Sequence, residues 1–174
     1  MGTKRRGRLM GMALSQRGRE ALSVALDDED VLQRYAAKVV TVPGSGCWWW
    51  TGAVSGRGHG RFWIGGGRVV IAHRFAWAMT CGVEALGEVS VLGHRCDNPL
   101  CQRVGSDHVV ESSPIQNRRE WAARRSLAGG ALGDPRGARQ RAVELRDLAR
   151  ADPARVAAHL QGQTLVCGEQ PRLF

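Results

Sequence analysis

The chain has 174 residues, a length that suits one domain with extensions, and its 25 lysines and arginines outnumber its 16 acidic residues for a net charge of +9. Such a charge favours a polyanionic partner such as nucleic acid. No apolar run approaches the ~20 residues that a bilayer span requires, so we expect no membrane contact. Five cysteines, an odd number without a secretory signal, argue against a disulfide framework and predict metal-ligating thiols in a reducing cytoplasm.

The first half of the chain predicts a basic arm, a short helix and several strands. Residues 1–27 are basic and weakly periodic, which predicts a mobile arm that contacts phosphates, or a plain disordered tail. Residues 28–40 begin with acidic side chains and repeat apolar ones at helical spacing, which predicts a helix. Alternation over 47–51 predicts a strand. The stretches 59–64 and 68–71 flank three glycines and predict a hairpin.

The middle of the chain predicts a helix over 72–81 and a strand over 89–95, which ends before a tight turn. Residues 113–116 read Ser-Pro-Ile-Gln, with serine suited to the N-cap, proline to the first helical position and glutamine to the third. This arrangement is a capping box and predicts a helix that runs to about Leu127.

The C-terminal part contains two Asp-Pro pairs that predict the starts of two Ala- and Arg-rich helices, over 135–150 and 153–161. Such a pair is a packing or oligomerisation element or, as an alternative, a helix-turn-helix DNA reader. The expected organisation is a basic flexible arm (1–27), a compact domain (28–128) and a helical extension with a peptide tail (129–174).

Five side chains suited to metal chemistry fall between His94 and Asn117. Cys96, Cys101 and His108 are soft or borderline ligands at the spacing of a zinc site. His94 offers an imidazole, which suits general-base chemistry near neutral pH. Asn117 offers a hard oxygen of the kind that Mg²⁺ accepts. A structural zinc beside a histidine base and a Mg²⁺ ligand indicates a nuclease that hydrolyses phosphodiesters.

From Tyr35 to Arg125 the sequence resembles the HNH superfamily, and specifically the His-Cys box homing endonucleases and the phage HNH proteins close to them. The landmarks are Gly46-Cys47-Trp48-Trp49-Trp50-Thr51-Gly52, Gly60-Arg61-Phe62, Ala72-His73-Arg74, and His94-Arg95-Cys96-Asp97-Asn98-Pro99-Leu100-Cys101 through His108 to Asn117. The resemblance implies an α+β fold, in which a small zinc-stabilised ββα-metal (HNH, His-Me finger) domain follows antiparallel strands and precedes a helical C-terminal extension. It also implies a phage or mobile-element protein in the cytoplasm of a bacterial host cell.

The resemblance assigns catalytic roles to three matching residues. His94 matches the general base that takes a proton from the attacking water. Asn117 matches the single protein ligand of the catalytic Mg²⁺, and Arg61 matches a guanidinium that binds the scissile phosphate. Gly93 departs from the many HNH enzymes that place Asp before the base as a second metal ligand.

The resemblance also implies a structural zinc with four ligands: Cys47, Cys96, Cys101 and His108. Cys81 is the alternative to Cys47 for the fourth position. The homing enzymes have a second Cys-rich zinc site, but after Asn117 this chain has only Cys167. Their mode of dimerisation is therefore not carried over.

We expect DNA contact from arginines of the hairpin and of the helix after the metal site: Arg57, Arg61, Arg68, Arg118, Arg119, Arg124 and Arg125. Each of them, taken singly, also suits a solvated surface. Gln170, Leu173 and Phe174 resemble a short bacterial sliding-clamp-binding peptide, which makes the clamp a candidate partner. We interpret His59 and His73 as structural residues.

The sequence thus predicts a Mg²⁺-dependent HNH endonuclease, stabilised by zinc, that nicks or cuts DNA. One alternative is a zinc-containing DNA-binding protein without catalysis. Another is an accessory protein of phage replication or packaging that acts through the C-terminal peptide. A single catalytic unit makes one nick, so double-strand cutting would require a homodimer or two binding events.

Overall fold

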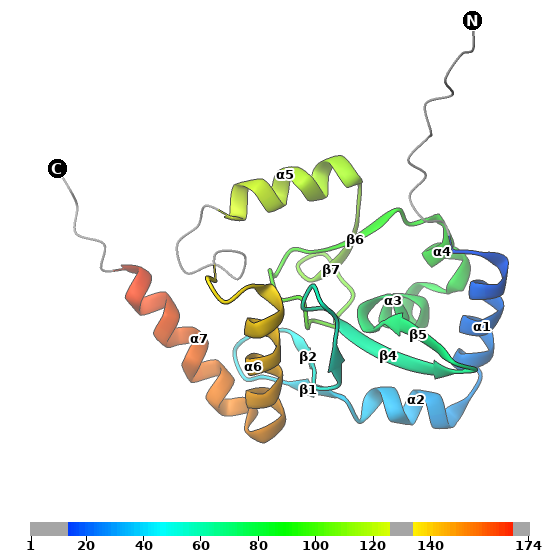
Figure 1. Ribbon diagram of the computed structural model, residues 1–174, viewed down its shortest axis with the longest axis horizontal. Helices are drawn as coiled ribbons and strands as arrows, with labels where there is room; N and C mark the ends of the chain where they lie inside the picture. Colours follow the sequence, from blue (N-terminus) through cyan, green and yellow to red (C-terminus); the bar gives the residue numbers. More distant parts are fainter. Residues whose placement is uncertain (1–13, 126–133, 169–174) are drawn as a thin grey trace, which may run out of the picture.

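Short antiparallel sheets alternate with helices along the chain, which confirms the α+β class (Figure 1). The computed structural model describes residues 14–125 and 134–168, with side chains described over 14–123 and 134–160. Its sheets join β1 (Val39–Thr41) with β2 (Trp48–Trp50), β3 (Ala53–Val54) with β4 (Gly60–Gly65) and β5 (Arg68–Ile71), and β6 (Val91–His94) with β7 (Val109–Ser112). The helices are α1 (Gln16–Leu26), α2 (Glu29–Ala36), α3 (Ala72–Cys81), α4 (Val83–Glu88), α5 (Pro114–Arg125), α6 (Ala138–Ala151) and α7 (Pro153–Gly168).

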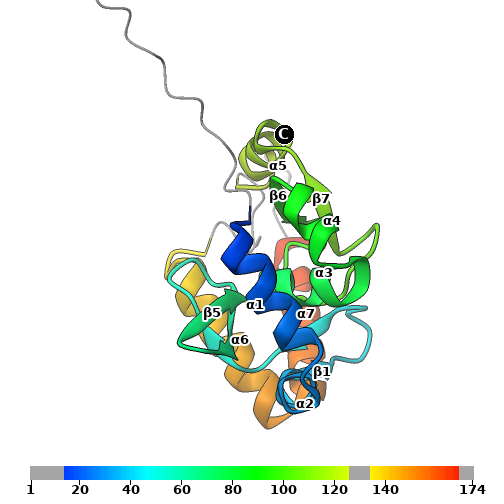
Figure 2. The same ribbon diagram turned by 90° about the vertical axis from the view of Figure 1, so that its right-hand side faces the viewer.

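Helix α1 corrects the predicted mobile arm. It begins at Gln16, and the Ser15 side chain caps it by accepting a hydrogen bond from a backbone N–H of the first turn. Leu22 and Ala25 are buried in the core, and α1 packs against α2, α3, α4 and β4. Figure 2 shows α1 at the front of the molecule. The arm prediction was wrong here because a narrow apolar stripe lies among many polar residues and gives a weak periodic signal. Residues 1–13 lie outside the described ranges.

Helix α2 confirms the predicted helix over 28–40, but it is shorter at its C-terminal end. Asp28 caps it by accepting from the Asp30 N–H at 2.9 Å. The helix ends at Ala36 because Val39–Thr41 pairs antiparallel with Trp48–Trp50. This pairing brings the tryptophan strand into the core.

Four aromatic rings form the centre of that core: Tyr35, Trp50, Phe62 and Phe75. Their contacting pairs have centroids 4.9 to 5.8 Å apart. Gly60 permits this packing, because a β-carbon there would lie 2.6 Å from Cδ1 of Trp50. The predicted hairpin of β4 and β5 and the predicted helix over 72–81 are both confirmed.

Strands β6 and β7 form an antiparallel hairpin, and helix α5 follows directly and packs on β6. Ser113 Oγ accepts from the Gln116 N–H at 3.1 Å, as the capping box predicts. The Gln116 side chain does not form the second hydrogen bond of a capping box, the one back to the Ser113 N–H, but donates to Glu120 at 3.0 Å. Helices α5 and α2 lie at opposite ends of the molecule (Figures 1 and 2).

Helices α6 and α7 pack as a pair, and α6 lies against β2 and β3, with Ala142, Leu145 and Ala149 buried. Helix α6 begins three residues later than predicted. The Asp134 side chain accepts from the Arg136 N–H at 2.9 Å and pairs with its guanidinium, so 134–137 form a turn. Helix α7 begins at the predicted Pro153. The helical extension is thus packed onto the compact domain.

Candidate functional site

Four side chains that were predicted as zinc ligands meet in one cluster: Cys47, Cys96, Cys101 and His108. Their ligand atoms all lie within 4.8 Å of one another. Nδ1 of His108 is 3.6 Å from Sγ of Cys47 and 3.7 Å from Sγ of Cys101. A tetrahedral ion with Zn–S bonds of about 2.3 Å and Zn–N bonds of about 2.05 Å separates such atoms by about 3.5 Å. The cluster therefore suits a four-coordinate metal ion, and exposed Cys81 is outside it.

Backbone hydrogen bonds explain how Cys47 reaches a turn 50 residues further along the chain. The Trp50 N–H donates to the Leu100 carbonyl at 2.9 Å, and the Gln102 N–H donates to the Trp48 carbonyl at 2.8 Å. Strand β2 therefore pairs with the segment that carries Cys101. Within the turn, Asn98 Oδ1 accepts from the Leu100 N–H at 3.0 Å, which fixes the loop between the two clustered thiols.

The three thiols cannot all ionise easily without a cation. Hydrogen bonds from Cys101 and Cys47 hold the pKa of Cys96 well below its ordinary value. The hydrogen bond to Cys47, the bond to Cys96 and burial raise the pKa of Cys101. A divalent cation favours the thiolate form of all three cysteines and removes this conflict.

A second cluster holds three imidazoles, those of His59, His73 and His94. Their nitrogens also lie within 4.8 Å of one another, and Nε2 of His94 is 3.3 Å from Nδ1 of His73. His59 leads β4, His73 lies in the first turn of α3, and His94 ends β6. Sequence reasoning treated His59 and His73 as structural and missed this cluster. Their spacing in the chain gives no periodic signal, because three different elements bring them together.

Burial keeps two of these imidazoles neutral. It lowers the pKa of His59 to about 4, with a smaller contribution from the charge of His94. It also lowers the pKa of His73 well below the ordinary value, since that ring is only 5% exposed. Both side chains therefore present a nitrogen lone pair at neutral pH.

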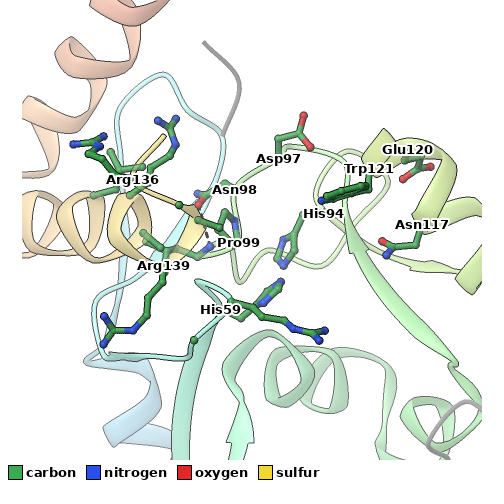
Figure 3. Close-up of a pocket in the computed structure, with 18 residues that line it drawn as sticks. His59, His94, Asp97, Asn98, Pro99, Asn117, Glu120, Trp121, Arg136 and Arg139 are labelled. Atoms are coloured by element: carbon green, nitrogen blue, oxygen red, sulfur yellow. Dashed lines mark hydrogen bonds between the residues drawn. The ribbon is translucent and has the colours of Figure 1, made fainter. Parts of the chain in front are cut away.

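His94 and Asn117 line the same cavity, of about 670 Å³, together with Arg57, His59 and Trp121. We call it the main cavity. Figure 3 shows the His94 and His59 rings close together, with Asn117 on α5. The beginning of α6 closes the opposite wall. A smaller cavity, of about 540 Å³, lies beside it and is also lined by His94 and Asn117.

Protein 2.8 of Escherichia phage T7 is 33% identical to this chain over 108 residues, which cover 61% of the chain and 68% of that protein. The chain belongs to the protein 2.8 family. Protein 7.7 of the same phage is 33% identical over 84 residues, 48% of the chain and 61% of that protein. No protein-family model matches the chain, and no solved structure matches it.

In this member of the protein 2.8 family, the arginines predicted to contact DNA differ in their position relative to the two cavities. Of the seven arginines predicted to contact DNA, Arg57 lines both cavities. Arg61 projects from β4, is exposed, and lines neither one. Arg68, Arg118 and Arg119 are exposed and also lie outside the cavity walls. The side chains of Arg124 and Arg125, and the tail residues Gln170, Leu173 and Phe174, lie outside the described part of the chain.

Other arginines that sequence reasoning missed contribute to the walls. Arg74, directly after His73, lines the smaller cavity. Arg136, Arg139 and Arg141 line the main cavity from the start of α6. The Ala-His-Arg landmark was a signal for Arg74, whereas nothing in the sequence linked α6 to the site. None of the described helices is long and apolar enough to cross a bilayer.

Proposed function

We propose that this protein is a Mg²⁺-dependent HNH endonuclease, stabilised by zinc, that hydrolyses DNA phosphodiester bonds. The observation that carries the proposal is that His94 and Asn117 line one cavity from adjoining elements of a β-hairpin and a helix. That order, β6, β7 and α5, is the order of the ββα-metal unit that the resemblance implies. Three residues of the metal-ligand cluster, Cys96, Cys101 and His108, lie in the loop that joins β6 to β7.

His94 would act as the general base. It is only partly exposed, lies at the end of a strand, and faces a cavity large enough for a phosphodiester and water. Its imidazole would take a proton from the attacking water. The neighbouring His59 and His73 rings, which are largely buried, would restrict the movement of the His94 ring.

Asn117 would hold Mg²⁺ through Oδ1, with phosphate oxygens and water in the other positions. When bound, Mg²⁺ supplies stabilisation of the charge that develops on the phosphate and on the leaving oxygen. The residues fit such an ion only in part, because a single amide oxygen is a weak site alone. Tight binding would therefore depend on the DNA.

The Cys47, Cys96, Cys101 and His108 cluster would hold the structural zinc. Three thiolates and one imidazole form a closed set that leaves no position for substrate. The cluster joins β2 to the turn that follows His94, so its role would be to fix the catalytic hairpin. In a domain with short strands, metal binding contributes directly to folding.

Arg57, one of the seven predicted arginines, and the α6 arginines line the main cavity, whereas Arg61 does not. Arg57 lies in the wall shared by both cavities, next to His59. Arg139 and Arg141 line the same cavity at the start of α6. We propose that Arg57 binds the scissile phosphate in place of Arg61. The net charge of +9 supports a polyanionic substrate.

Conversion of supercoiled plasmid to open-circular or linear DNA in Mg²⁺ tests the proposal. The parent should cut, whereas His94→Ala and Asn117→Ala should not, each confirmed to retain zinc. Gln116→Ala, a neighbour of Asn117 on the same exposed helix, is the matched control and should cut. Cutting by both site variants would overturn the assignment. Zinc and DNA binding without cutting, on a native target as well, would favour the non-catalytic DNA-binding alternative.

A further inference from the structure

We propose that His59, His73 and His94 form a second metal site, which takes a transition-metal cation such as Zn²⁺, Co²⁺ or Ni²⁺. The site adjoins the Cys47, Cys96, Cys101 and His108 cluster, since His94 forms a hydrogen bond with Cys96, but its three ligand atoms come from imidazoles alone. Imidazole nitrogens suit these cations, whereas Mg²⁺ prefers oxygen.

The distance between two of the nitrogens supports the proposal. Nε2 of His94 and Nδ1 of His73 are 3.3 Å apart. A tetrahedral ion with two Zn–N bonds of about 2.05 Å separates its nitrogens by about 3.35 Å. The His73 and His94 rings are nearly perpendicular, at 86°, in an edge-to-face arrangement rather than a stack. The third ring, His59, has a nitrogen within 4.8 Å of both and is stacked on His94, with centroids 5.7 Å and planes 28° apart. A rotation about the side-chain bonds of His59 completes the set.

The surroundings of the three rings also favour a preformed site. His73 is buried at the start of α3, and His94 is held by the pairing of β6 with β7. His59 is fixed by two bonds with Ser55: its N–H donates to Ser55 Oγ at 3.2 Å, and its carbonyl accepts from the Ser55 N–H at 2.8 Å. Ligands on fixed elements lose little freedom when the cation binds.

With three protein ligands, this site leaves a fourth coordination position that opens to solvent-accessible space. In the Cys/His cluster a fourth protein ligand fills that position. All three histidines line the smaller cavity, and so do Arg57 and Arg74. Water or a phosphate oxygen can fill the open position, and the two guanidinium groups favour the anion. Three protein ligands with one open position are the arrangement of a reactive or exchangeable metal, and not of a closed structural one.

One consequence rests on the proposed function. A cation on Nε2 of His94 occupies the lone pair that a general base needs. Transition metals at this site should therefore inhibit Mg²⁺-dependent cutting, and His94 would link metal status to nuclease activity.

Cobalt titration of the protein that carries one equivalent of zinc, in the cysteine site, tests the histidine site without reference to activity. Added Co²⁺ should give weak visible bands without the intense near-ultraviolet thiolate band that a cysteine site produces, and mass spectrometry under native conditions should show Zn and Co together. The binding should be lost in His59→Ala and in His73→Gln. The matched control is His159→Ala, on α7, which should bind cobalt as the parent does. His59 is half-buried, so its variant tests the site even if the His73 variant does not fold.

Two results would overturn the inference: no cobalt beyond the cysteine site in the parent, or undiminished cobalt binding in a folded His59→Ala variant. The plasmid assay separates it from the proposed function. Cobalt binding without Mg²⁺-dependent cutting would support the second metal site and contradict the proposed nuclease function. Cutting that excess Co²⁺ leaves unchanged, with the site occupied, would remove the inhibitory role alone.

Discussion

A β-carbon placed on Gly93 would lie 3.6 Å from Oδ1 of Asn117. That is ordinary van der Waals contact, so a small side chain fits at position 93 beside the proposed Mg²⁺ ligand. The other near neighbour of that point is Ser112, whose Cβ is also 3.6 Å away. The strand that ends in His94 therefore passes directly beneath the first turn of α5, and Gly93 leaves the space between them open.

Gly93→Asp should lower the Mg²⁺ concentration needed for half-maximal plasmid cutting. A carboxylate would add a charged oxygen next to Oδ1 of Asn117, and we expect a change of about tenfold, equivalent to about 1.4 kcal/mol. Gly93→Asn, which has the same shape without the charge, is the control and should change the requirement less. An unchanged Mg²⁺ dependence in the Asp variant would mean that the ion does not bind at Asn117.

Cys101→Ser should abolish zinc binding at the Cys47, Cys96, Cys101 and His108 cluster and the cooperative thermal transition. Structural zinc contributes about 10–16 kcal/mol in small zinc-dependent folds, which matches or exceeds the total stability of most domains. Cys81→Ser removes an exposed thiol outside the cluster and should change neither property. Zinc analysis and circular dichroism on both variants provide the measurement. A Cys101→Ser protein that melts as the parent does would remove the structural role of the metal.

Arg57→Ala should slow DNA cutting more than Arg61→Ala. A hydrogen bond to a charged group contributes about 1.5–3 kcal/mol, so the loss at Arg57 should be roughly 10- to 100-fold in rate. Arg61 lines neither cavity, and its substitution should have a small effect. Initial cutting rates at fixed ionic strength decide between them. The reverse order would restore the phosphate role to Arg61 and indicate that DNA approaches over the outer face of β4.

Asp134→Asn should destabilise the start of α6, and the difference should vanish in acid. Hydrogen bonds from Arg136 lower the pKa of Asp134 from 3.8 to about 2. Because the folded pKa is depressed, the contribution is present above about pH 3.8 and is lost as the pH falls towards about 2. We expect a loss of about 1 kcal/mol at pH 7, from urea unfolding.

Asp147→Asn is the matched control for this substitution. Asp147 lies on the same helix, pairs with its neighbour Arg146 at 2.8 Å, and has a side chain that is 53% exposed. Its replacement should change stability very little at any pH. Equal effects of the two substitutions at pH 7 would show that the 134–137 turn does not hold α6 in place.

Sequence reasoning was most accurate where a local pattern carries the structure. The hairpin around residues 65–67, the helix over 72–81 and the Ser113 cap are all confirmed, because turn glycines, apolar spacing and capping act within a few residues. It failed for α1, because the burial of Leu22 and Ala25 depends on the packing of α1 against α2, α3 and α4. The start of α6 shifted because Asp134 bonds to Arg136 in a turn.

The sequence by itself determined which residues carry metal chemistry and the order in which they follow one another. It also supplied a prediction of the four ligands from Cys47 to His108, and of His94 with Asn117. Tertiary structure alone decided that His59 and His73 join His94, because their approach depends on how β4, α3 and β6 pack. It likewise placed Arg57 in the cavity wall and left Arg61 outside, since a strand alternates the faces of its side chains and only the packed sheet shows which face adjoins the site.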